Sequence, residues 1–187
     1  MEKLYIKISG LSPLLMNNPA NMMIGRTKLP TPEEEVRQSR YSMPDESLYV
    51  PSIALRKSIL LGATGYKIGK FSLKSRLSAA IQLFEERFPI SDERGENTSD
   101  YAIDRRRVVI RGAGIIRSRA RVEPPWFVAG YFKVNSELLM DRYGIVQIDL
   151  LREIINVAGQ VSGLLDFRPN RGGWFGQYEL MDIEIQE

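Results

Sequence analysis

"DLLREIINVAGQVSGLLDFRPNRGGWFGQYELMDIEI", residues 149–185, joins a helix pattern, a glycine-rich segment and a strand pattern in direct succession. Asp149 can act as the helix N-cap, and Gly163 can end the helix as its C-cap. Between them, apolar residues recur at helical spacing: Leu151, Ile154, Ile155, Ala158 and Val161. Residues 177–185 then have the composition of a strand, so the chain is predicted to finish with helix, loop and strand.

The rest of the chain supplies the matching elements. Residues 3–10 alternate apolar and polar side chains, which predicts a first strand with one buried face. Residues 51–65 predict a helix, with Ser52 as its N-cap, an apolar stripe along one side and a glycine stop. Residues 106–122 and 126–134 are rich in β-branched and aromatic residues, and Pro124-Pro125 separates them. We expect them to form two adjacent antiparallel strands.

A further helical pattern covers residues 74–88, where the apolar stripe Leu77, Ile81, Phe84 and Phe88 is predicted to face the core. With this inserted helix set aside, the order is β-α-β-β-α-β. The sequence therefore predicts an α+β, ferredoxin-like (RRM-like) fold with a four-stranded antiparallel sheet and one open sheet face. This plan serves RNA-recognition domains, small-molecule sensors and enzymes, so it does not select a function.

The length of 187 residues predicts a single domain over 1–187. Two long connections interrupt it, an excursion at about 17–48 and a helical and loop insertion at about 66–104. Inside the excursion, Thr31 as N-cap and Pro32 at the first helical position predict a short helix. The same excursion carries a group of basic and aromatic residues: Arg26, Lys28, Arg37, Arg40 and Tyr41.

The composition narrows the function classes. The chain has no His and no Cys, which removes the commonest general acid/base, the commonest neutral metal ligand and every thiolate site. We therefore expect no catalytic residue, no metal and no cofactor. No run approaches the roughly 18 apolar residues of a membrane span, and the start lacks the features of a signal peptide. The predicted location is the cytoplasm, without membrane contact.

Basic residues cluster along the chain although the net charge is only +3. Strand geometry places Arg117, Arg119 and Arg121 on one face, about 6–7 Å apart, near the phosphate spacing of an extended nucleic acid. A solvated face paired with acids would have the same pattern. Upstream arginines favour binding: Arg105, Arg106, Arg107 and Arg111. On the first helix, Arg56 and Lys57 lie off the apolar stripe.

The glycine-rich segment has the composition of a phosphate-and-base clamp. Gly172 and Gly173 allow close backbone approach to a ligand, and Arg168 and Arg171 can hold phosphate. Aromatic rings available to stack on a base are Phe167, Trp174 and Phe175. The alternative is an ordinary turn whose aromatic side chains belong to the core.

Four features of the chain occur together: "SGLSPLLM" after the first strand, "YVPSIALRKSILLG" at the first helix, an arginine-rich strand pair, and a glycine-rich loop before the last strand. In these four features the chain resembles the RAMP superfamily of CRISPR-associated proteins. The chain looks most similar to the backbone subunits that assemble along a guide RNA, and to their relatives in phages and mobile elements. The resemblance implies RNA binding through the glycine-rich loop, the first helix and the open sheet face. It also implies that the excursion acts as a thumb on a neighbouring subunit.

We therefore predict a non-catalytic protein that binds single-stranded nucleic acid, RNA by the resemblance, and forms a helical homo-oligomer along it. Other CRISPR-type effector subunits are possible partners. The expected contact residues are Arg56, Lys57, Arg117, Arg119, Arg121, Arg168, Arg171, Gly172, Gly173, Trp174 and Phe175. Three alternatives stay open: a single-stranded-DNA-binding protein, a purely structural oligomer, and a RAMP-type endoribonuclease. In the last case Asp45 is the candidate acid, although "MPDES" is equally an ordinary turn.

Overall fold

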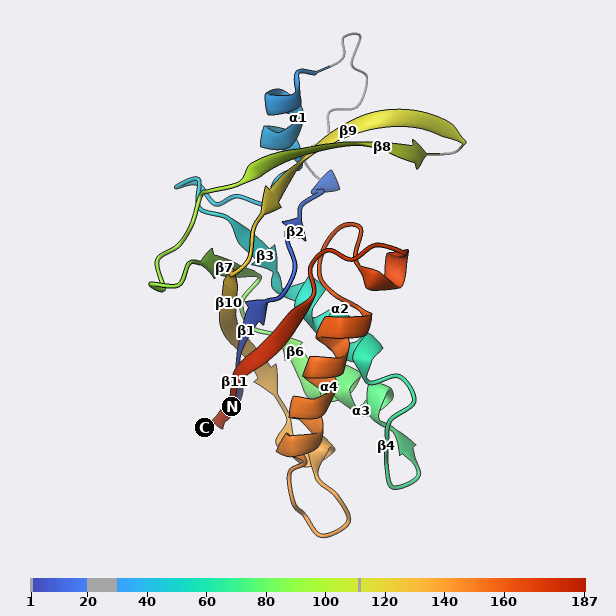
Figure 1. Ribbon diagram of the computed structural model, residues 1–187. Helices are drawn as coiled ribbons and strands as arrows, with labels where there is room; N and C mark the ends of the chain where they lie inside the picture. The colour runs from blue at the N-terminus through green and yellow to red at the C-terminus, as the bar shows by residue number, and fades with distance from the viewer. Residues whose placement is uncertain (1, 20–29, 111) are drawn as a thin grey trace.

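The computed structural model describes residues 2–19, 30–110 and 112–187. It is a mixed α+β structure with antiparallel sheets and four helices (Figure 1). The helices are α1 (Pro32–Ser39), α2 (Ser52–Gly62), α3 (Leu73–Ala80) and α4 (Ile148–Val161), with short 3-10 turns η2 (Ser136–Leu139) and η3 (Pro169–Arg171). The strands are β1 (Lys3–Gly10), β2 (Leu14–Leu15), β3 (Tyr49–Pro51), β4 (Lys67–Ile68), β5 (Phe71–Ser72), β6 (Ile81–Leu83), β7 (Arg87–Ser91), β8 (Ala102–Ile110), β9 (Ala113–Val122), β10 (Phe127–Val134) and β11 (Tyr178–Gln186).

The main sheet has six strands. Five of them lie in the order β11-β1-β10-β7-β3, and β6 pairs with the far end of β10. The alternating pattern predicted for β1 is confirmed, because Leu4, Ile6 and Ile8 are fully buried. The predicted last strand is also confirmed, as β11 pairs antiparallel with β1 from Lys3 to Gly10.

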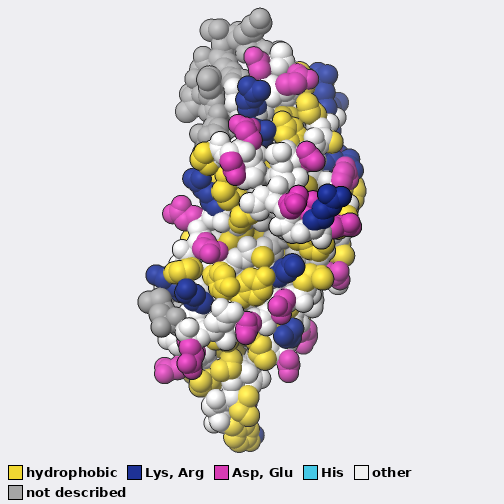
Figure 2. Space-filling model, turned by 90° about the vertical axis from the view of Figure 1, so that its left-hand side faces the viewer, with side chains coloured by type: hydrophobic (Ala, Val, Ile, Leu, Met, Phe, Trp, Pro, Cys, Tyr) yellow, Lys and Arg dark blue, Asp and Glu magenta, His cyan; other side chains and the backbone are white. Residues whose placement is uncertain are grey.

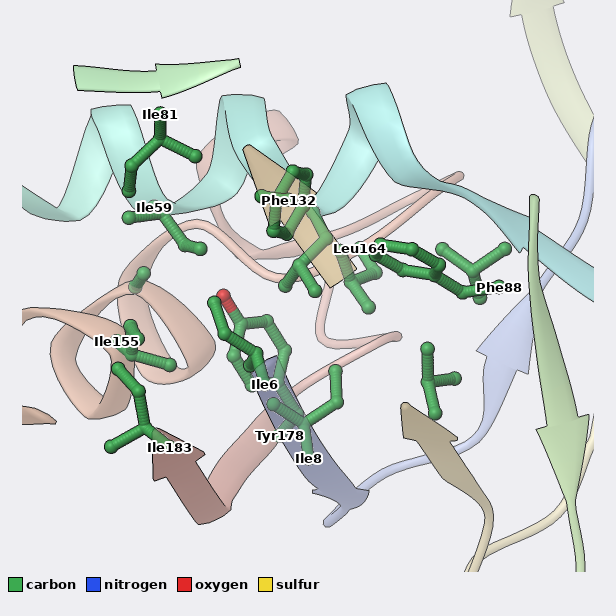
Figure 3. Close-up of a cluster of buried hydrophobic side chains, with 14 of the residues drawn as sticks. Ile6, Ile8, Ile59, Ile81, Phe88, Phe132, Ile155, Leu164, Tyr178 and Ile183 are labelled. Carbon is green, nitrogen blue, oxygen red and sulfur yellow. The ribbon is translucent and has the colours of Figure 1, made fainter. Parts of the chain in front are cut away.

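Helices α2 and α4 cover one face of this sheet (Figure 1). Between helices and sheet lies the core, where Ile59 of α2 and Ile155 of α4 approach side chains from β1, β10 and β11 (Figure 3). α4 begins at Ile148 with Gln147 as N-cap, so the prediction of Asp149 as N-cap was wrong by two residues. Val161, the last residue of the predicted apolar stripe, is 54% exposed and lies outside the core. In α2, Ser52 is the first helical residue and not the N-cap.

A second sheet of three strands, β2-β9-β8, lies above the main sheet (Figure 1). The prediction that 106–122 is one strand beside 126–134 was wrong. The chain reverses at Gly112, whose φ of 82° suits a residue without a side chain, and β8 and β9 form a hairpin from Ala102↔Arg121 to Ile110↔Ala113. β10 instead pairs with β1, β6 and β7.

The predicted helix over 74–88 was wrong beyond Ala80. Residues 81–83 and 87–91 form β6 and β7, which join the main sheet, so part of the expected insertion at 66–104 belongs to this sheet. Pro89 disfavours a helix at the preceding residue. Leu77, Ile81 and Phe88 are buried as expected, but Phe84 is 45% exposed.

Helix α1 confirms the predicted short helix in the excursion. Thr31 accepts a hydrogen bond from the Glu34 N–H, and the Glu34 side chain accepts one from the Thr31 N–H, which completes a capping box. α1 packs across β8 and β9 of the same chain. Arg26 and Lys28, expected to belong to a thumb, lie outside the described residues, as does Arg111.

Candidate nucleic-acid interface

A cleft of about 820 Å³ opens between the β8–β9 hairpin, α2 and the segment that follows α4. In Figure 1 the hairpin extends above the loop that carries η3. Seven basic residues line the cleft: Lys57, Arg106, Arg107, Arg117, Arg119, Arg168 and Arg171. Asp166 is the one acidic residue in its described lining. Three segments that are distant in the sequence thus bring their cations to one hollow.

Five of the predicted contact residues meet in this cleft: Lys57, Arg117, Arg119, Arg168 and Arg171. The others lie outside its described lining: Arg56, Arg121, Gly172, Gly173, Trp174 and Phe175. Asn17 and Ser58, which were not predicted from the sequence, also line the cleft. Neither carries a sequence signal that could have found it, because each reaches the cleft only through the tertiary fold.

The arginines on β9 are each paired with an acid. Arg117 Nε lies 2.7 Å from Glu35 Oε1 of α1, and Arg121 Nε lies 2.6 Å from Glu123 Oε1. Arg119 forms an ion pair with Asp166 through Nη1. The row is therefore not a set of free cations, and the acids come from α1, from the loop after α4 and from the end of β9.

Arg119 is the most buried member of this row, with 5% of its surface exposed. Its Nε and Nη2 atoms have no hydrogen-bond partner among the described residues. Buried donors without partners are costly, so this guanidinium retains capacity for a water or an anionic oxygen.

Three exposed cations in the cleft have a different environment. Lys57, Arg107 and Arg171 make no ion pair with any residue in the described ranges. They come from α2, β8 and η3, so three different elements contribute them to the lining of the cleft. Because their charge is uncompensated locally, they are the side chains best placed to attract an anion.

Arg168 belongs both to the cleft and to the loop's own structure. Its Nη1 donates to the Leu165 carbonyl at 2.7 Å and its Nε to Asn170 Oδ1 at 2.8 Å. Burial, together with the charge of Arg171, lowers the pKa of the Arg168 guanidinium, while Asp166 acts in the opposite direction. Burial is the larger cause, so the shift mainly reflects the partial removal of this guanidinium from water.

The two predicted glycines serve the loop in different ways. Gly172 ends η3 with a φ of 76°, and a Cβ there would meet open space. At Gly173 a Cβ would lie 1.7 Å from the Phe167 carbonyl oxygen. The structure therefore gives Gly173 a packing role inside the loop, which is a correction to its expected role in ligand approach.

The aromatic residues of this segment also differ in their exposure and in whether they line the cleft. Phe175 is fully buried, so it was wrongly expected to stack on a base. Its ring lies 4.7 Å from that of Trp174 and 6.0 Å from that of Phe167, measured between centroids. Trp174 is 51% exposed but outside the cleft lining, whereas Phe167 is 37% exposed and within it.

Arg56 is engaged within the fold. Its Nε donates to the Ile81 carbonyl at 2.7 Å and its Nη2 to the Ser78 carbonyl at 2.6 Å. These carbonyls lie at the C-terminal end of α3, where helix carbonyls lack intrahelical partners. The structure thus explains Arg56 as a connection between α2 and α3, in place of the expected contact with nucleic acid.

Asp45, the candidate catalytic acid, lies in a turn. Its Oδ1 accepts hydrogen bonds from the Ser47 N–H at 3.1 Å and from the Ser47 hydroxyl at 2.6 Å, and these bonds lower the pKa of the carboxyl group. Asp45 is not among the residues that line the cleft. Within the described ranges no three acidic residues are grouped so that they could hold a metal ion.

The face of the molecule on the left of Figure 1 has a mixed charge (Figure 2). Lys and Arg alternate there with Asp and Glu around a central group of hydrophobic side chains. On β1 and β10 the rings of Tyr5 and Tyr131 lie 5.2 Å apart, and Lys7 of β1 is in register with Asp182 of β11. Cations on this face are thus interspersed with acids, whereas the described lining of the cleft holds seven cations and one acid.

Of the described helices, none has the length and apolar character needed to cross a membrane. Comparison with known proteins adds no assignment. No protein-family model matches the chain, and a search of curated proteins found no matching relative.

Proposed function

We propose that this protein binds a single-stranded nucleic acid, with the strand seated in the cleft between the β8–β9 hairpin, α2 and the loop after α4. The observation that carries the proposal is the convergence of seven Lys and Arg side chains on one hollow whose described lining holds a single acid. Such a concentration of cations favours a polyanion, because each phosphate contact releases condensed counterions. Aromatic and apolar residues in the same lining, Phe167, Tyr41 and Ile53, give an unpaired base a surface to contact.

Single-stranded RNA is the ligand we propose, on the strength of the resemblance to RAMP backbone subunits. A ferredoxin-like core is part of the same proposal. In chain order β1, α2, β7, β10, α4 and β11 can supply its β-α-β-β-α-β elements. The neighbours β11-β1-β10-β7 then have the order 4-1-3-2 of that topology, with β3 added at the edge. In chain order, the β8–β9 hairpin lies between the second and third strands of this core.

Assembly of several copies along one strand is also proposed, on the same resemblance. Its test is the mass of the complex. Light scattering with RNA of increasing length is expected to show stepwise growth in the number of bound subunits. A single bound copy at every RNA length would contradict assembly while leaving binding itself in place.

Binding is tested by fluorescence-anisotropy titration of labelled oligouridylate with a triple variant, Lys57→Ala, Arg107→Ala and Arg171→Ala. These exposed side chains make no ion pair with a described residue, so their removal should leave the fold intact. The matched control removes three exposed cations outside the cleft: Lys70→Ala, Lys74→Ala and Arg94→Ala.

The cleft variant is expected to bind more weakly, and its salt dependence should fall by about 0.7 in log–log slope for each lost phosphate contact. The control variant has the same net charge and should retain most of the wild-type affinity and slope. Equal losses in the two variants would mean that net charge, and not the cleft, determines binding. Absence of wild-type binding to any single strand would overturn the proposed function.

A further inference from the structure

The loop after α4 places one aromatic ring in the basic cleft. Phe167 lines the cleft and is 37% exposed, while its ring lies 6.0 Å from the buried ring of Phe175. Arg106 stands beside this pair, with its Cζ 5.9 Å from the centroid of Phe167 and 4.8 Å from that of Phe175. Asp104 accepts from Arg106 Nε at 2.6 Å and also pairs with Nη2, which fixes the guanidinium in this position.

The backbone holds Phe167 in an unfavourable conformation. Its φ is 48°, and that of Leu165, two residues earlier, is 57°. A bulky side chain rarely occupies this left-handed region, because its Cβ approaches the following carbonyl. Strained positions of this kind persist only where surrounding structure over-determines them, and they cluster at ligand sites.

Several contacts keep the strained segment in place. The Phe175 N–H donates to the Phe167 carbonyl at 3.2 Å, and the Asp166 N–H donates to the Leu15 carbonyl at 3.0 Å. Gly173 leaves the space that the Phe167 carbonyl occupies. These bonds restrain the backbone on both sides of the ring while part of the ring surface remains uncovered, which is the arrangement expected of a preorganised contact surface.

We infer that Phe167 is the platform on which one base of the bound strand stacks. The inference rests on the proposed function, and it assigns to Phe167 a contact with a base, whereas the cations of the cleft contact phosphates. Arg168 follows Phe167 directly, Arg171 comes three residues later, and both line the same cleft, so a nucleotide stacked on the ring has cations nearby for its phosphate. Trp174 is more exposed, but it lies outside the lining.

The experiment measures the binding of two strands of equal length, by wild-type protein and by Phe167→Leu. One strand is an oligouridylate that carries one 2-aminopurine, and the other is abasic at every position. Stacking quenches 2-aminopurine fluorescence, so wild-type protein is expected to quench it on binding. Phe167→Leu should lose the quench and about 5- to 100-fold in affinity for the base-bearing strand. Its affinity for the abasic strand should be unchanged. Trp174→Leu, the matched control in the same segment, should behave as wild type, and Phe167→Trp should restore both quench and affinity.

The outcomes separate the inference from the function. If Phe167→Leu quenches 2-aminopurine and binds the base-bearing strand as wild-type protein does, the assignment of Phe167 as the stacking platform is overturned. Loss of binding in the cleft triple variant would still support the proposed function. An equal loss on both strands, without restoration by Phe167→Trp, would show that Phe167 only maintains the loop. Failure of wild-type protein to bind either strand would overturn the proposed function itself.

Discussion

Trp174 and Phe175 are neighbours with opposite environments, and this difference predicts opposite consequences of their removal. Phe175 is fully buried, so Phe175→Ala is expected to lower the free energy of unfolding by about 3–5 kcal/mol. Trp174 is 51% exposed, and Trp174→Ala should cost less than about 1 kcal/mol. Urea unfolding of the two variants measures both values. Similar losses in the two variants would contradict the burial assigned to them.

At this scale the sequence could identify the candidates but not their environments. A glycine-rich loop has no periodicity, so nothing in "GGWF" tells which ring is covered. Phe167 lines the cleft and Trp174 does not, and this difference depends on the left-handed backbone at Phe167 and on the position of β8, which are tertiary features. For the same reason the acids that pair with Arg117 and Arg119 could not be named in advance.

On helix α2, alanine substitutions of the adjacent basic residues Arg56 and Lys57 are expected to have different effects. Arg56→Ala should lower the free energy of unfolding by roughly 1–3 kcal/mol, because the Ile81 and Ser78 carbonyls lose their charged donor. It should leave the affinity for RNA unchanged. Lys57→Ala should weaken RNA binding and leave stability unchanged, because Lys57 is exposed in the cleft. Thermal melts with parallel anisotropy titrations check both variants, and the reverse pattern would contradict these roles.

Elements with strong local signals were predicted well. β1, α1, α2, α4 and β11 each have a clear alternation, apolar stripe or cap, and each is present within two residues of its expected start. The segment from Ile81 to Phe88 was wrongly predicted as helix, because its apolar spacing fits a helix and its pairing with β10 and β3 is long-range. The β8–β9 hairpin was missed because β-branched residues lie on both sides of Gly112.

Over the whole molecule, the cleft results from the meeting of the β8–β9 hairpin with α2 and the loop after α4, which no local pattern contains. The three-stranded sheet carries β8 and β9 above the main sheet, and the loop after α4 lies below the hairpin (Figure 1). Lys57, Arg107 and Arg171 are 50 and 64 residues apart in sequence, yet they line one hollow. The basic clusters themselves were visible in the sequence, but their convergence required the tertiary structure.

Catalysis is expected to be absent from this arrangement. Asp45 is engaged by Ser47 and lies outside the cleft lining, so labelled single-stranded RNA should remain intact after incubation with the protein and Mg²⁺. Gel electrophoresis of the RNA over time checks this expectation. Cleavage that is abolished by Asp45→Ala would assign the activity to the turn, and cleavage that survives it would require an unrecognised site.

Photochemical cross-linking of RNA that contains 4-thiouridine, followed by mass spectrometry of the peptides, reports where the strand lies on the folded protein and so tests binding in the cleft. If the strand lies in the cleft, cross-links are expected in peptides that carry Phe167 and in the part of β8 that lines the cleft, residues 106–109. These cross-links should disappear in the variant with Lys57→Ala, Arg107→Ala and Arg171→Ala. Cross-links confined to Tyr5 and Tyr131 on the main sheet, and unaffected by that variant, would contradict binding in the cleft.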